Sequence, residues 1–243
     1  MKKIEILYPE FGGIYGERYN VDYLMRSCPE LTLIETAHGQ VPAFTKGEAD
    51  MVYLGCTPEK HQEEIIELLR PYKEDILREI ERGTIFLITG NAIEIFGNRI
   101  KDGDRVIDCL SMFDFESIRY MDKFRHNSQY VGKANLGGEE ITLLGHRSQF
   151  SFAYGDFNDY FIDIEIGMGM NKSTKREGIR KNNFYATYSL GPYLILNPLF
   201  AKYLLRLMDL PDALCFEKEI MEAYEYRKNE LIEKLGILPD YPH

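Results

Sequence analysis

The sequence lacks the features that mark nucleic-acid-binding, metal-binding and disulfide-stabilised proteins. Its 29 Lys and Arg residues are outnumbered by 39 Asp and Glu, for a net charge of −10, and no Lys/Arg-rich block is present. Nucleic acids and anionic membranes need a concentrated positive surface, so neither is an expected partner. The four cysteines form no Cys-x-x-Cys pair, which argues against a zinc site and a disulfide framework. We therefore expect no metal, no cofactor and a reducing, cytoplasmic location.

Long apolar runs are also missing. No stretch of about 18 apolar residues is available to cross a membrane. The N-terminal MKKIEILYPE alternates apolar with polar residues, unlike the apolar centre of a signal peptide. Hydrophobic residues make up 44% of the 243, enough to fill a core without stabilising disulfide bonds or metal ions. Because no internal repeat, low-complexity tract or linker is found, we expect one domain over residues 1–243.

The first half alternates short apolar runs with helical patterns, which predicts βαβ units and a parallel sheet. Between the last two of these runs, residues 58–82 carry Ile and Leu at helical spacing. Pro71 predicts a break into two helices, and Gly83 predicts the end of the second. The expected strands cover residues 3–9, 31–36, 50–55 and 84–89.

The second half is less regular, and polar or Gly-containing loops join several of its expected strands. The basic run NKSTKREGIRKNN at 171–183 is expected to be a solvated loop. Amphipathic patterns predict two C-terminal helices within 197–235, at 197–208 and 212–235. The expected strands are 105–110, 140–146, 161–167 and 184–190.

The segment LITGNAIEIFG at 87–97 has the pattern of a nucleophile elbow. An apolar strand ends in a tight turn and is expected to resume as a helix, the arrangement that presents a nucleophile in many α/β enzymes. Gly90 permits a strained backbone and Asn91 tolerates left-handed geometry. No Ser or Cys stands at the tip, however, and Thr89 is the nearest hydroxyl. An ordinary strand-to-helix turn is the alternative interpretation.

A second strand-to-helix turn contains Gly55, Cys56 and Thr57, where the carboxyl end of a parallel strand favours ligand binding. Cys56 followed by His61 is compatible with a thiol nucleophile and its base, or with a small turn residue and a surface histidine. His146 ends an expected strand and either faces a cleft or is structural.

Four segments together resemble the class I glutamine amidotransferases of the cobyric acid synthase type, most closely the lipid II isoglutaminyl synthase group. The resemblance covers residues 4–209 and implies a three-layer α/β/α domain with a mixed, mostly parallel sheet. The segments that carry it are LYPEFGGIYGERYNVDYL (7–24), ADMVYLGCTPEKHQEE (49–64), LITGNAIEIFG (87–97) and GMGMNKSTKREGIRKNNFYATYSLGPYLILNP (167–198).

The family's chemistry makes the differences from its pattern informative. In these enzymes an elbow Cys attacks the side-chain amide of glutamine, a His in a "YLHGP" segment acts as base and acid, and backbone N–H groups of a "GGG" loop stabilise the oxyanion. In register, Gly90 stands at the Cys position and Leu190, after Ser189, stands at the His position. The glycine loop reads Gly55-Cys56-Thr57, and Gln129 stands where the closest group has an Arg, with Arg125 nearby.

The resemblance therefore implies an amidotransferase-like protein that has lost glutamine hydrolysis, with Gly90 and Leu190 facing each other across a pocket shaped like an active site. Its partner would be a ligase-type subunit, either Mur-ligase-like or cobyric acid synthase-like, in peptidoglycan or cobalamin synthesis. Two alternatives remain: an enzyme with a relocated nucleophile at Cys56, and a stand-alone binder of a small amide or amino acid. The candidate pocket residues are Gly55, Cys56, Thr57, Thr89, Gly90, Asn91, Gln129, His146, Ser189 and Leu190.

Overall fold

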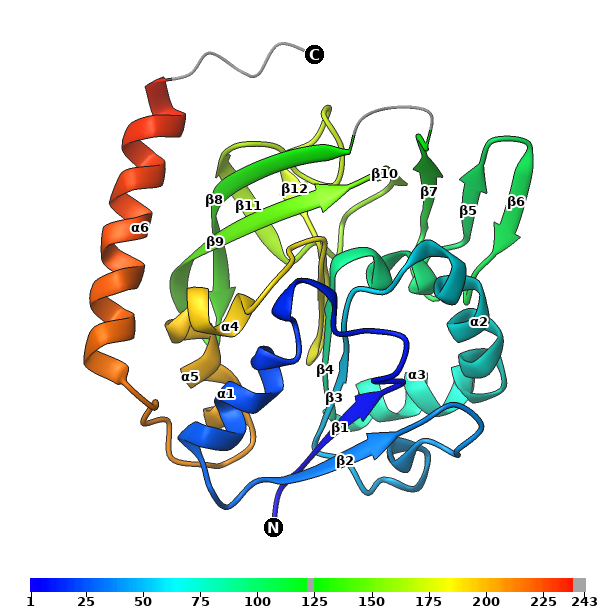
Figure 1. The fold of residues 1–243 in the computed structure, drawn as a ribbon, viewed down its shortest axis with the longest axis horizontal. Coiled ribbons are helices and arrows are strands. Elements are labelled where there is room, and N and C mark those ends of the chain that lie inside the picture. Colours follow the sequence, from blue (N-terminus) through cyan, green and yellow to red (C-terminus); the bar gives the residue numbers. More distant parts are fainter. Residues whose placement is uncertain (122–124, 238–243) are drawn as a thin grey trace.

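A computed structural model describes residues 1–121 and 125–237, and its centre is a six-stranded sheet in the order β13-β14-β4-β3-β1-β2 (Figure 1). Four of its strand pairings are parallel, and only β13 runs antiparallel to its neighbour β14. The strands are β1 (Lys3–Leu7), β2 (Thr32–Thr36), β3 (Met51–Leu54), β4 (Ile85–Thr89), β13 (Ile179–Lys181) and β14 (Phe184–Thr187).

Helices cover both faces of this sheet, and side chains that alternate along each strand divide the core between the faces. In β3, Met51 and Tyr53 pack on one face, whereas Val52 and Leu54 pack on the other. The first face is covered by α1 (Tyr19–Ser27), α4 (Tyr193–Leu196) and α5 (Pro198–Leu207), and the second by α2 (Glu59–Leu69) and α3 (Lys73–Arg82). This arrangement confirms the expected α/β fold with a mixed, mostly parallel sheet.

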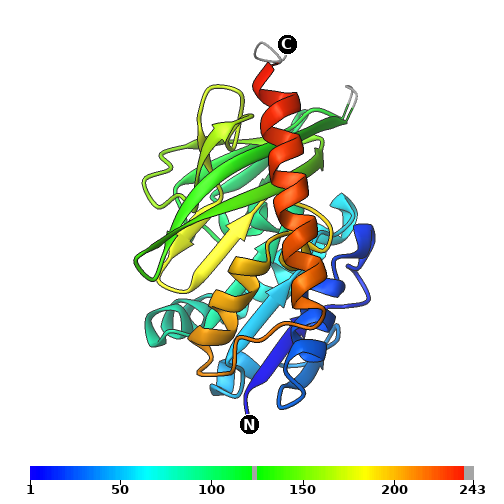
Figure 2. The same cartoon turned by 90° about the vertical axis from the view of Figure 1, so that its left-hand side faces the viewer.

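Two four-stranded sheets lie beyond the carboxyl ends of the central strands (Figure 2). One has the order β10-β7-β5-β6 and joins the α2–α3 side of the core, and the other has the order β12-β11-β8-β9 and joins the α1–α5 side. Their strands are β5 (Arg99–Asp102), β6 (Arg105–Asp108), β7 (Phe115–Arg119), β8 (His126–Leu136), β9 (Glu139–Gln149), β10 (Ser151–Gly155), β11 (Ile162–Ile166) and β12 (Arg176–Glu177).

The C-terminal helix α6 (Glu217–Ile237) packs along the outer face of β8 and β9 (Figure 2). Tyr224 and Leu231 of this helix are buried against Val131 and Leu144. The Tyr224 hydroxyl also donates a 2.8 Å hydrogen bond to the carbonyl oxygen of Thr142. Within the described ranges, no helix combines the length and apolar character needed to cross a membrane.

The local predictions for the first half agree closely with the structure. Strands lie within all four expected ranges, and the expected break at Pro71 is a 3₁₀ turn, η3 (Arg70–Tyr72), between α2 and α3. Gly83 ends α3 with a left-handed φ of +97°, which a side chain would disfavour. After β4 the chain resumes as a 3₁₀ helix, η4 (Gly90–Phe96), in place of the regular helix expected after the elbow.

The prediction of a solvated loop at 171–183 is wrong. This segment contains β12 and β13, and Glu177, the last residue of β12, is fully buried. The segment pairs with β11 and β14, and Arg147, also fully buried, lies 3.2 Å from the Glu177 carboxylate. The basic residues of the run gave no signal of this partner, which lies 30 positions earlier.

Candidate functional site

The elbow at the end of β4 brings together three residues expected at the site. Gly90 has a left-handed φ of +64°, and its N–H donates a 3.0 Å hydrogen bond to the carbonyl oxygen of Ser189. A Cβ atom built on Gly90 would lie 2.5 Å from Cys56 Cβ and 2.7 Å from Leu190 Cδ2. Such distances are shorter than any ordinary contact, so the tip of the elbow has no room for a side chain.

The geometric prediction for Gly90 and Leu190 therefore needs a correction. The two residues do lie side by side, but the Leu190 side chain and Cys56 fill the space next to Gly90. Cys56 and Leu190 also border a cavity of about 30 Å³, together with Tyr15 and Gln149. That volume suits a few water molecules, because each needs roughly 10–15 Å³.

The loop 55–57 is held from two sides by side chains. Cys56 N–H donates to the carboxyl group of Glu17. Thr57 N–H donates to Asn91 Oδ1 at 3.0 Å, and Asn91 Nδ2 donates back to the Thr57 carbonyl oxygen at 2.7 Å. Both amides are consequently bonded within the protein.

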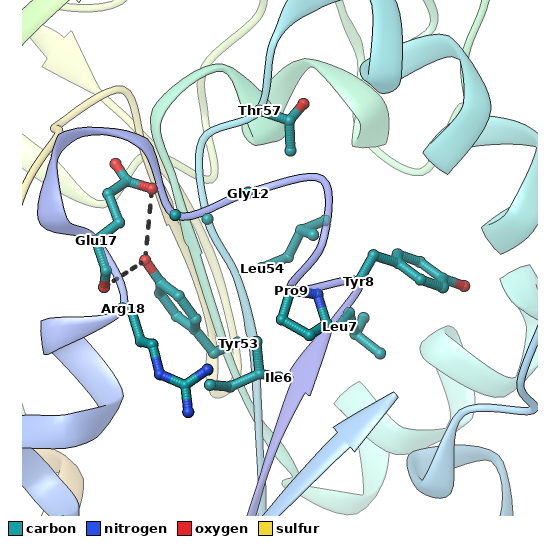
Figure 3. Close-up of a pocket in the computed structure, with 12 residues that line it drawn as sticks. Ile6, Leu7, Tyr8, Pro9, Gly12, Glu17, Arg18, Tyr53, Leu54 and Thr57 are labelled. Atoms are coloured by element: carbon teal, nitrogen blue, oxygen red, sulfur yellow. Dashed lines mark hydrogen bonds between the residues drawn. The ribbon is translucent and has the colours of Figure 1, made fainter. Parts of the chain in front are cut away.

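Glu17 is the main site residue that sequence analysis did not single out. Its side chain is fully buried, and Oε2 also accepts a 3.1 Å hydrogen bond from Thr89 Oγ1. Tyr53 Oη donates to the same oxygen at 3.5 Å (Figure 3). Burial is the largest influence on its pKa, which rises to about 8 despite these bonds. The only sequence signal was an acidic residue in a turn after the first strand of a parallel sheet.

A second cavity, of about 50 Å³, lies beside Glu17 between the carboxyl ends of β1 and β3 (Figure 3). Pro9, Gly12 and Leu54 are among its lining residues. β1 lies between β2 and β3 in the sheet, so the chain passes from β1 to its neighbour on one edge and then returns to its neighbour on the other edge. Crevices at such reversals of strand order are frequent binding positions in open α/β sheets.

The Cys56 thiol is poorly suited to act as a nucleophile in this arrangement. The residue is only 5% exposed. Burial, followed by the negative charge of Glu17, raises the thiol pKa well above its ordinary value, so the thiolate is disfavoured. The ring of His61, the candidate base, lies against Phe11, with ring centroids 4.9 Å apart.

Gln129 and His146 are brought together, but their side chains lie away from the elbow. The two residues are directly opposite in the β8–β9 ladder, on the same face as Val131 and Leu144, which pack against α6. Burial and the charge of Arg227 in α6 lower the pKa of His146. The His146 carbonyl oxygen accepts a 2.9 Å hydrogen bond from the N–H of Leu190, which packs beside the elbow.

Ser189 belongs to a buried polar network behind the elbow. Its hydroxyl lies 2.7 Å from Tyr130 Oη and 3.1 Å from Thr187 Oγ1. Thr187 in turn donates to Glu177 at 2.9 Å, which continues the network to the buried ion pair with Arg147. These contacts give Ser189 a structural role in fixing the segment that carries Leu190.

A second buried network supports η4 from the other side. Glu94 accepts hydrogen bonds from Gln62 Nε2 at 3.1 Å and Tyr188 Oη at 3.1 Å. Arg119 donates to Gln62 Oε1 at 2.6 Å, and Gln62 also donates to the Asn91 carbonyl oxygen at 2.5 Å. Burial raises the pKa of Glu94. The elbow is thus held rigidly from both sides.

Arg125 provides positive charge at the edge of the 30 Å³ cavity. Its guanidinium carbon lies 4.6 Å from the ring centroid of Phe150 and 5.8 Å from that of Tyr15. Cation–π contacts of this kind hold a guanidinium in place while leaving its edge available for hydrogen bonding. Across residues 1–121 and 125–237, no group of three or more His, Cys, Asp or Glu residues is placed to hold a metal ion.

Comparisons with known proteins support the fold. The chain is similar to one in the structure of PurLQS from Thermotoga maritima, with 9% identity, a TM-score of 0.54 and coverage of 93% of this chain and 98% of that one. A glutamine amidotransferase from the same organism gives 10% identity, a TM-score of 0.51 and coverages of 95% and 93%. The Trypanosoma brucei CTPS glutaminase domain with bound acivicin gives 7% identity, a TM-score of 0.50 and coverage of 88% of this chain and 98% of that one.

At such low identities these similarities describe the architecture alone: the chain has a class I glutamine amidotransferase-like fold. No model of a protein family matches the sequence, and no curated protein is similar to it at a significant level.

Proposed function

We propose that this chain is an amidotransferase-like protein without glutaminase activity that serves as a binding or partner subunit of a ligase-type amidation system. The observation that carries the proposal is the packing around Gly90, where Cys56 and Leu190 occupy the space that a nucleophile would need. Glutamine hydrolysis by the family's route needs a nucleophile, a base and free oxyanion donors. Gly90 and Leu190 supply neither of the first two, and Glu17 takes the Cys56 amide.

The partner in this proposal is a ligase-type enzyme, Mur-ligase-like or cobyric acid synthase-like, with peptidoglycan and cobalamin synthesis as the candidate pathways. The similar chain in the PurLQS structure supports an assembly of several subunits. Exposed large apolar side chains on and beside α6 supply contact surface, since Phe216 is 69% and Tyr226 is 72% exposed.

A glutaminase assay combined with covalent labelling tests the loss of activity. The purified protein is incubated with glutamine, and ammonia release is measured beside an intact glutamine amidotransferase. A second sample is treated with acivicin and examined by mass spectrometry. We expect no ammonia above background and no adduct, and an adduct on any residue would overturn the inactive assignment.

Cys56→Ala separates the proposal from the alternative of a relocated nucleophile. If ammonia release were observed and disappeared in this variant, Cys56 would be the nucleophile. We expect the wild-type protein and Cys56→Ala to be equally inactive, because the thiol is buried and its pKa is raised. Cys109→Ala, at another buried cysteine, is the matched control.

Co-purification tests the partner role. The tagged chain is expressed in its native host at native level, and associated proteins are identified by mass spectrometry. Recovery of a ligase-type protein, with loss of recovery in Phe216→Asp/Tyr226→Asp, supports the proposal. The proposal is contradicted if the purified protein is monodisperse and binds none of the candidate ligases in pairwise tests.

A stand-alone small-molecule binder is the second candidate function, and Arg125 favours it. A guanidinium stacked on two rings at the edge of a cavity suits a carboxylate ligand. Thermal-shift measurements with glutamine, glutamate, simple amides and nucleotides test this candidate. A shift that is lost in Arg125→Met would support it, and no shift with any compound would count against it.

A further inference from the structure

The 30 Å³ cavity beside the elbow is bordered by one positive and one negative residue that do not pair with each other. Arg125 precedes β8, and Glu59 is the first residue of α2. Within the described part of the chain, neither charged group forms an ion pair or a hydrogen bond. The contacts of the Arg125 guanidinium are with the rings of Phe150 and Tyr15, which leave its N–H groups available. Both charges are therefore free to bind a ligand.

A buried hydrogen-bond acceptor without a partner borders the same cavity. Gln149 is only 6% exposed, and its Nε2 donates to the carbonyl oxygen of Ser151. Because that carbonyl can only accept, the orientation of the amide is fixed and Oε1 is the atom left over. No donor among residues 1–121 and 125–237 bonds to Oε1. A buried acceptor in this state is costly, so a ligand that donates to it removes the cost.

Other buried polar side chains of the lining are already bonded within the protein. Thr57 Oγ1 donates to the carbonyl oxygen of Pro58 at 3.3 Å. The hydroxyl groups of Ser151 and Tyr188 both donate to Glu94. The strongest groups left for a ligand are therefore a cation, a carboxylate and an amide oxygen. This set is complementary to a carboxylate and an ammonium group carried by one molecule.

The cavity also limits the length of any side chain that the ligand carries. Its volume of about 30 Å³ suits a few water molecules, not a chain of several carbon atoms. Cys56 and Leu190 border the cavity and fill the space next to Gly90, where an added Cβ would lie within 2.7 Å of both. A long side chain therefore has no room towards the elbow.

We propose that this cavity binds a short zwitterionic α-amino acid, such as glycine or alanine, and excludes longer ones such as glutamine. Arg125 binds the carboxylate, Glu59 binds the ammonium group, and Gln149 Oε1 accepts one of the ammonium hydrogens. Leu190 sets the limit on length. The inference rests on the second candidate function, the small-molecule binder, and names its ligand.

Isothermal titration calorimetry on the wild-type protein tests both charges and the length limit. Glycine and alanine are compared with acetate, which lacks the ammonium group, and with methylamine, which lacks the carboxylate. Loss of either charge-assisted contact should weaken binding by about tenfold or more relative to glycine. Glutamine has both charges but a longer side chain, and we expect it to bind at least about tenfold more weakly than glycine because Leu190 and Cys56 leave no space for two further methylene groups.

Substitutions assign the contacts. Arg125→Met and Gln149→Met each keep a side chain of similar length but remove one polar partner, and each should weaken glycine binding by about tenfold. Arg26→Met changes the net charge by the same amount as Arg125→Met at an exposed position of α1, and should leave glycine affinity unchanged. Leu190→Ala, with folding checked by circular dichroism, should improve glutamine affinity by about tenfold.

The ligand series separates failure of this inference from failure of the binder function on which it rests. Acetate or glutamine binding as tightly as glycine would overturn the short-amino-acid site and leave a carboxylate binder standing. Glycine binding that is unchanged in Arg125→Met and Gln149→Met would overturn the assigned contacts. No binding of any of the compounds would overturn both. Because the ligand comparison uses the wild-type protein, it decides the question even if a variant does not fold.

Discussion

At the scale of single residues, the site is defined by side chains that fill space and use up hydrogen bonds. Leu190 and Cys56 lie against Gly90, Glu17 takes the Cys56 amide, and Asn91 takes the Thr57 amide. The identities of Gly90 and Leu190 were readable from the sequence, and their place at the Cys and His positions of the family is what the resemblance implies. The role of Glu17 was not readable, since a glutamate in a polar turn is ordinarily exposed.

Gly90→Ala should destabilise the protein by about 3 kcal/mol, because the new methyl group meets Cys56 and Leu190 and because φ is +64°. Gly103→Ala is the matched control: its φ of +59° is similar, but no atom lies within 4 Å of the new Cβ. The control should cost only about 1 kcal/mol of backbone strain. Denaturant unfolding compares the two, and equal losses would contradict the packing argument.

Arg147→Met should cost about 3–5 kcal/mol of unfolding free energy, because it leaves the Glu177 carboxylate buried without its partner. Lys101→Met breaks a partly exposed ion pair with Glu116 and should cost less than about 1 kcal/mol. Chemical denaturation measures both variants. A small loss in Arg147→Met would contradict the buried ion pair with Glu177.

At the scale of secondary-structure elements, the first half of the chain was predictable throughout, whereas in the second half the four expected strands and two expected helices were found but other strands were missed. Strands β1 to β4 are compact apolar runs, separated by helices with clear periodicity and by Gly83 and Pro71. By contrast, β8 reads HNSQYVGKANL, which is polar and contains Gly, and it forms because β9 and β11 pair with it. His146 illustrates the consequence: its place in a strand was expected, but the face on which its side chain lies depended on α6.

Helix α6 offers a test of packing at this scale. Leu231 is 5% exposed and packs on the β8–β9 face, whereas its neighbour Ile232 is 44% exposed. Leu231→Ala should therefore cost about 2–3 kcal/mol, and Ile232→Ala should change stability by no more than about 0.5 kcal/mol. Thermal or denaturant unfolding checks the pair, and similar values for the two would mean that α6 does not pack in this way in solution.

At the scale of the whole molecule, several carboxyl groups are buried with raised pKa values. Burial is the largest cause for Glu5, Glu17 and Glu94, which lie in three separate parts of the core. A group whose pKa is higher in the folded than in the unfolded protein binds its proton more tightly when folded. The group's contribution to the free energy of unfolding is complete below its pKa in the unfolded protein, about 4.5. That contribution is lost as the pH rises through its pKa in the folded protein.

The free energy of unfolding should accordingly fall as the pH rises from about 5 to about 8.5, with each unit of pKa shift corresponding to about 1.4 kcal/mol. Urea denaturation at several pH values measures the slope. Glu17→Gln should show a shallower slope than the wild-type protein, whereas substitution of the exposed Glu233 should leave the slope unchanged. Stability that rises over this interval would contradict the assignment of buried, uncompensated carboxyls.

The sequence by itself determined the alternation of strands and helices in the first half and the presence of Gly and Leu, which carry no reactive side chain, at positions 90 and 190. These properties depend on residue identity and on spacing within about a dozen positions. Only the tertiary structure decided that Cys56 and Leu190 close the space over Gly90, that the Cys56 amide bonds to Glu17, and that His146 lies near Arg227 of α6. Contacts of this kind join residues dozens of positions apart, so burial and pairing decide them and local pattern does not.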